Sequence, residues 1–249
     1  MKIIKNIPAA FFAAAMAFGV SANLSAQSRE FKQGRCMLYT ETPDTAGAVM
    51  ARSIVAIDGG DVDNPVNKSN PGKWRLSGND FSLEVDGLKI HANSTGTPLY
   101  YKGTYITPQG ESTRCEALMV PYSMWGIFSE KLKNNLIAGQ YTKAYVHFWY
   151  ADDLFMPQKA YPVEVKFNPV EGFNGGSIEI SGSPELMSLL SSPTIPYYFD
   201  GKMLNVVRPN GRIVEDNLDE GFAQVWVRFD DTIQLPGIGE ALAYLAIYY

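Results

Sequence analysis

Three of the Asp-Gly and Asn-Gly dipeptides in this chain, each lying between two strand-like stretches, most restrict how it can fold. They are Asp86-Gly87, Asp200-Gly201 and Asn210-Gly211, and β-branched and aromatic residues are frequent on both sides of each. A type I′ turn needs a positive φ at both central residues, which these dipeptides adopt at low cost. Each dipeptide therefore predicts a two-residue hairpin between neighbouring antiparallel strands.

The side-chain pattern around the first dipeptide agrees with a two-residue loop. On one face, the loop pairs apolar residues with apolar residues: Val85 with Leu88, Leu83 with Ile90, and Phe81 with Ala92. On the other face, Glu84 lies opposite Lys89. Turn chemistry and alternation thus predict the same register. Upstream, a strand at Lys73–Leu76 and a turn at Ser77–Asp80 extend the hairpin to a three-stranded meander.

Alternation elsewhere in the chain predicts a mainly β fold with two helices. Segments 144–150, 161–167, 178–180 and 223–229 alternate as half-buried strands do. Helices are predicted at about 123–138 and 184–191, the second with Pro184 at its first position. We expect an antiparallel β-sandwich or two abutting sandwich-like units, 28–121 and 122–249, with one continuous domain 28–249 as the alternative.

The first 26 residues have the layout of a secretory signal peptide. Lys2 and Lys5 precede an apolar stretch, Ile7–Val20, and small residues lead to a cleavage site after Ala26. No later run reaches the roughly 18 apolar residues that a spanning helix needs. We therefore expect cleavage and a soluble mature protein in a periplasm or outside the cell.

The net charge of the chain and its expected compartment indicate which partners and which covalent cross-links are plausible. The chain carries 21 Lys and Arg against 26 Asp and Glu, which argues against a nucleic-acid partner. An oxidising compartment permits a disulfide between Cys36 and Cys115, with two buried free thiols as the alternative. Such a bridge would close a loop of about 80 residues and contribute roughly 4–5 kcal/mol. Neither cysteine has the spacing of a redox or zinc motif.

One glycine-rich loop is a candidate calcium site. Its oxygen donors are Asp58, Asp61, Asp63 and Asn64. Calcium takes six to eight oxygen ligands, which carboxylates on such a turn can supply, although the spacing is not that of an EF-hand. An ordinary polar turn is the alternative. The sequence predicts no other cofactor.

Aromatic residues on two predicted strands suggest a ligand-binding face. Tyr145, His147 and Trp149 share one face of the first strand, and Trp226 lies on the polar face of the second. A tryptophan on the outer face of a sheet is either covered or binds something, and sugars stack on indole rings. The four residues therefore predict a carbohydrate platform. The alternative is that the helix at 123–138 packs over these rings.

These patterns favour a non-enzymatic, exported binding or surface-assembly protein. Carbohydrate is the expected ligand, so the partner would be an extracellular glycan or another exported protein. One alternative is an extracellular hydrolase with a carboxylate pair, for which the sequence assigns no catalytic residue. Another is a structural subunit with an uncovered strand edge.

Overall fold

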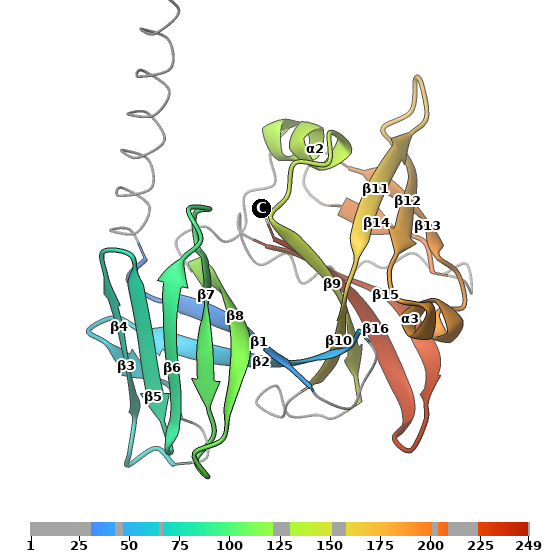
Figure 1. Ribbon diagram of the computed structural model, residues 1–249. Coiled ribbons are helices and arrows are strands. Elements are labelled where there is room, and N and C mark those ends of the chain that lie inside the picture. The colour runs from blue at the N-terminus through green and yellow to red at the C-terminus, as the bar shows by residue number, and fades with distance from the viewer. Residues whose placement is uncertain are drawn as a thin grey trace, which may run out of the picture.

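The computed structural model describes residues 31–42, 47–64, 67–121, 130–150, 158–200, 204–208 and 224–248, which are mostly β-strand (Figure 1). The described residues of the first half form eight strands. They are β1 (Gly34–Glu41), β2 (Val49–Ile57), β3 (Asp61–Val62), β4 (Gly72–Ser77), β5 (Asp80–Val85), β6 (Leu88–Ser94), β7 (Tyr100–Ile106) and β8 (Ser112–Pro121).

These eight strands form a closed antiparallel barrel. Each strand pairs with the next along the chain, and β8 pairs back with β1. Met37 of β1 therefore lies opposite Ser53 on one side and Leu118 on the other. Each of the eight described strands thus has a partner on both sides, although β3 supplies only two residues to its ladders.

The prediction of an open sandwich is wrong, because the first half closes into a barrel that carries extra strands. Alternation shows only that one face of each strand is buried, which a sandwich and a barrel satisfy equally. Strand β1 is the exception, since six of its eight residues are buried. Its inner face lines the barrel, and its outer face packs on the second half through Met37 and Tyr39.

Side chains fill most of the barrel interior. Leu38, Phe81, Ile90 and Met119 are fully buried there. Phe31 packs at one end, with its ring edge-on to Trp74 at 5.3 Å between centroids. An eight-stranded barrel is just wide enough for side chains or for one small ligand. Any space for a ligand is therefore expected at the other end.

The second half contains the remaining strands and two helices. They are α2 (Glu130–Ile137), β9 (Lys143–Trp149), β10 (Gln158–Pro162), β11 (Glu164–Pro169), β12 (Gly175–Ser181), α3 (Pro184–Leu189), β13 (Thr194–Phe199), β14 (Leu204–Val206), β15 (Gln224–Leu235) and β16 (Gly239–Tyr248).

The barrel sheet continues directly into this second half. Strand β10 pairs with β2, and the order then runs β10-β9-β16-β15. Strands β11 to β14 form a separate four-stranded sheet. An apolar core joins the two sheets, with Phe148 and Leu245 from the first and Ile178 and Tyr197 from the second.

The hairpin predictions have three different outcomes. The turn at Asp86-Gly87 is confirmed, with Val85 opposite Leu88 and Glu84 opposite Lys89. At Asp200-Gly201 the hairpin exists, but Phe199 lies opposite Leu204, so the connection has four residues, 200–203, and not two. The prediction at Asn210-Gly211 lies outside the described residues.

The short helix is confirmed and the longer one is described only in part. α3 begins at Pro184, and the hydroxyl of Ser183 accepts a hydrogen bond from the Leu186 backbone N–H at 3.3 Å. α2 covers Glu130–Ile137, and residues 123–129 of the predicted helix lie outside the described residues. No helix in the described part of the chain is long and apolar enough to cross a membrane.

The predicted disulfide is wrong, because Cys36 and Cys115 are buried free thiols. Strand register explains the error: Cys36 lies opposite Met119, whereas Cys115 lies opposite Thr40. Four residues of strand correspond to about 13 Å. A disulfide requires a Cα separation of about 4.4–6.8 Å, so the two thiols cannot meet without moving the backbone.

We expect both thiols to be unreactive in the native protein and accessible after unfolding. Burial raises the pKa of Cys36 far above its usual range and that of Cys115 to about 12, so neither forms the reactive thiolate at neutral pH. A thiol-specific chromogenic reagent should detect no fast-reacting group in buffer. It should detect two per chain in denaturant without reductant, and finding none there would contradict the free-thiol assignment.

Candidate functional site at the barrel mouth

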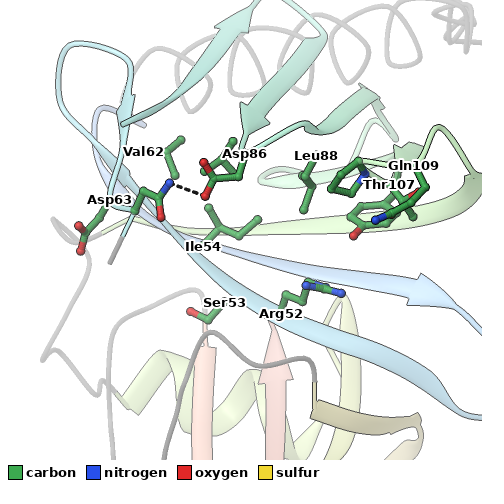
Figure 2. Close-up of a pocket in the computed structure, with 13 residues that line it drawn as sticks. Arg52, Ser53, Ile54, Val62, Asp63, Asp86, Leu88, Thr107 and Gln109 are labelled. Carbon is green, nitrogen blue, oxygen red and sulfur yellow. Dashed lines mark hydrogen bonds between the residues drawn. The ribbon is translucent and has the colours of Figure 1, made fainter. Parts of the chain in front are cut away.

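A cavity of about 440 Å³ occupies the barrel end formed by the β5–β6 and β7–β8 turns (Figure 2). This is the opposite end from Phe31, since antiparallel pairing places Gly34 beside Pro121 and the β7–β8 turn at the far end. We call this cavity the barrel mouth. Its apolar wall consists of Ile54, Val62, Val85, Leu88 and Tyr105.

Strand alternation directs one cation into the barrel mouth. Ile54 of β2 faces the interior, and Arg52, two residues earlier, faces the same way. Across the β1–β2 ladder, Arg52 lies opposite Leu38, which belongs to the barrel core. The sheet therefore places a guanidinium beside an otherwise apolar interior.

Arg52 is half-buried, and not all of its hydrogen-bond donors have an acceptor among the described residues. The centre of its guanidinium lies 5.8 Å from the centroid of the Tyr105 ring, a cation–π distance. Its Nε atom is buried and has no hydrogen-bond partner among the described residues. A buried donor without an acceptor costs free energy that an incoming acceptor can recover. Arg52 is thus a ready partner for an oxygen acceptor in the barrel mouth.

Two carboxylates and an amide lie at the rim of the barrel mouth. The Asn64 side-chain amide donates to Asp86 Oδ2 at 2.6 Å, which ties the end of β3 to the β5–β6 turn (Figure 2). Its oxygen accepts from the Asn67 backbone N–H at 3.0 Å. Asp63 also lines the rim. The rim is therefore acidic, while among the described lining residues the wall below it carries one cation, Arg52.

The structure distributes the predicted calcium ligands among other contacts. Asp61 forms an ion pair with Lys73, and Asn64 is engaged with Asp86. Asp58 is exposed on the β2–β3 turn. Within the described ranges, no three or more His, Cys, Asp or Glu side chains form a group that could hold a metal ion. The calcium site stays a prediction.

The predicted carbohydrate platform is split between buried and half-buried positions. Tyr145 and His147 are each only 2% exposed. Trp149 is half-buried, and its ring lies 5.9 Å from that of Tyr244. The side chain of Trp226 lies outside the described residues. Neither Tyr145 nor His147 therefore offers an exposed ring face on which a sugar could stack.

Tyr145 and His147 belong instead to a polar layer between the barrel and the second half. The Tyr39 hydroxyl is hydrogen-bonded to His147 Nε2 at 2.9 Å and to the Tyr248 hydroxyl at 2.6 Å. The Tyr39 ring stacks on Tyr145 at 3.8 Å between centroids. Burial lowers the pKa of His147 to about 3, so the ring is neutral at pH 7.

Sequence reasoning did not identify Arg52 or Tyr105 as site residues. The sequence does mark Arg52, because strand alternation places it on the same face of β2 as Ile54 and Ala56, which face the core. A cation at a core-phase position indicates either a buried ion pair or a ligand site. No equivalent signal marks Tyr105, which resembles other strand aromatics.

No protein-family profile, curated protein or solved structure with which we compared the chain matches it.

Proposed function

We propose that the chain is an exported, non-enzymatic binding protein that holds a small ligand in the barrel mouth. The ligand has an apolar body and one anionic group, such as a carboxylate. The observation that carries this proposal is Arg52, a guanidinium directed into the barrel whose buried Nε atom has no hydrogen-bond partner within the described part of the chain. Export rests on the leader pattern of residues 1–26.

Size and charge define the ligand further. A volume of about 440 Å³ lies within the range of small-molecule pockets. Leu38 and Phe81 fill the barrel below, so a long chain cannot penetrate to the Phe31 end. A carboxylate matches the planar guanidinium of Arg52. Asp63 and Asp86 at the rim disfavour a second negative charge on the ligand.

This proposal keeps the expected binding role and moves the ligand to a different place. The carbohydrate expectation depended on Trp149, Trp226, Tyr145 and His147, and two of these, Tyr145 and His147, are buried. The barrel mouth offers an apolar wall with one cation, which suits an amphipathic acid better than a neutral sugar.

The test compares aliphatic and aromatic monocarboxylates with their primary amides by isothermal titration calorimetry. We expect at least one acid to bind about tenfold more tightly than its amide, since a charge-assisted hydrogen bond contributes about 1.5–3 kcal/mol. Arg52→Gln should abolish this preference. Arg75→Gln, which alters an exposed arginine on β4 outside the barrel mouth, is the matched control and should keep it.

Two results would contradict the proposal. One is equal affinity of acid and amide for the wild-type chain across the whole panel. The other is an Arg52→Gln variant that retains the preference while its thermal unfolding is unchanged.

A further inference from the structure

A second cavity, of about 560 Å³, lies where the outer face of the barrel meets the second half. Lys102, Arg114 and Glu116 line it from β7 and β8, and Lys143 and Tyr145 line it from β9. Figure 1 shows β1 and β2 running from the barrel to β9 and β10 and so bringing the two halves together. We call this cavity the junction groove.

Two lysines from different halves of the chain converge in the junction groove. Lys102 Nζ lies 3.3 Å from Glu116 Oε1, and Lys143 Nζ lies 3.5 Å from Glu116 Oε2. The same two ammonium groups lie 5.4 and 5.8 Å from the centroid of the Tyr100 ring. One carboxylate and one ring thus hold two cations close together, against their mutual repulsion.

Glu116 is fixed in its ionised form. The Tyr145 hydroxyl donates to Glu116 Oε2 at 2.8 Å. Burial acts to raise the pKa of Glu116, but the hydroxyls of Tyr145 and Tyr100 and the charges of Lys143 and Lys102 outweigh it and lower the pKa overall. Glu116 therefore positions the lysines across the neutral pH range.

Charge in the junction groove is biased toward the positive. Lys102, Arg114 and Lys143 face Glu41 and Glu116, which leaves one cation in excess. The whole chain has the opposite bias, with a net charge of −5. Arg114 is exposed and forms no ion pair with the residues that the structure describes. Its guanidinium remains available for an added anion.

We propose that the junction groove binds an oxyanion, a carboxylate or sulfate group, between Lys102, Arg114 and Lys143. Two ammonium groups and a planar guanidinium supply converging donors to an oxyanion, and the partly enclosed groove strengthens each contact. The source of the group is either an acidic glycan or a free inorganic anion. This site is separate from the barrel mouth and does not depend on it.

The experiment uses the full chain and three probes: a uronate trisaccharide, its methyl ester and inorganic sulfate. The methyl ester removes the negative charge and keeps the sugar rings. We expect the trisaccharide to bind at least tenfold more tightly than its ester by calorimetry, and binding to weaken with added salt. A free inorganic anion would be identified as the source if the trisaccharide binds no more tightly than sulfate, and sulfate binding is weakened by substitutions of Lys102 and Arg114. That result would also support the oxyanion site.

Substitutions distinguish binding in the junction groove from a general effect of surface charge on binding. Lys102→Gln and Arg114→Gln should each weaken binding of the tightest probe by about tenfold. Lys89→Gln is the matched control, because Lys89 also lies 3.3 Å from a glutamate, Glu84, and is comparably exposed (47% against 56% for Lys102). It should leave binding unchanged.

The proposal is overturned if the trisaccharide and its ester bind equally and sulfate does not bind. It is also overturned if Lys102→Gln and Lys89→Gln have the same effect. An Arg52→Gln variant should bind the groove probes normally, so failure here and failure at the barrel mouth can be told apart.

Discussion

Replacing Phe148 by alanine is expected to lower the free energy of unfolding by about 3–5 kcal/mol. Phe148 is 0% exposed and lies on β9, with its ring facing the core between the two sheets of the second half. It contacts Tyr161 edge-to-face at 5.7 Å between centroids. The substitution removes a whole ring from a close-packed core and leaves a cavity that the surrounding strands cannot fill.

The matched control is the same substitution at an exposed phenylalanine. Phe173 lies in the β11–β12 turn and is 62% exposed. Phe173→Ala should change the free energy of unfolding by no more than about 0.5 kcal/mol. Urea titrations followed by tryptophan fluorescence measure both variants. Similar effects of the two substitutions would contradict the assignment of Phe148 to the core.

Acidification is expected to destabilise the protein through His147 as the pH falls from about 6.5 to about 3. Burial lowers the pKa of this histidine to about 3 in the folded chain, whereas an unfolded chain has the ordinary value of about 6.5. Between these values the unfolded state binds the additional proton. The contribution of neutral His147 is therefore complete above pH 6.5 and is progressively lost below it.

His147→Gln should flatten this pH dependence. Glutamine can still hydrogen-bond the Tyr39 hydroxyl but does not titrate, so the variant is less stable than wild type at pH 7 and loses less on acidification. His91→Gln, at an exposed position on β6, is the control and should retain the wild-type slope. The measurement is the free energy of urea unfolding at pH 7.0, 5.5 and 4.5. Equal slopes for wild type and His147→Gln would contradict the prediction.

Local features of the fold were predictable because local chemistry determines them. The register around Asp86-Gly87 follows from the turn type, and Ser183 followed by Pro184 sets the start of α3. Closure of the barrel depends on the β1–β8 ladder, which joins residues such as Cys36 and Met119. No nearby residue encodes that pairing, so a sandwich was an equally consistent prediction.

The candidate sites were less predictable, because they too depend on contacts between residues that are far apart in the sequence. Arg52 carries a signal in its strand phase, but the apolar wall that makes it informative comes from several strands. Lys102 and Lys143 lie in different halves of the chain, and only the position of Glu116 brings them together. The disulfide prediction failed similarly, because the spacing of Cys36 and Cys115 in sequence carries no information on register.

Strand β1 has a thermodynamic consequence for the whole molecule. It pairs with β2 and β8 at once, and its outward-facing Tyr39 contacts Tyr145, His147 and Tyr248 of the second half. Detaching β1 opens the barrel, breaks two ladders and uncovers the layer beneath Tyr39 in a single event. The barrel core and the layer between the two halves therefore depend on the same strand, and both lose their native packing when β1 is released.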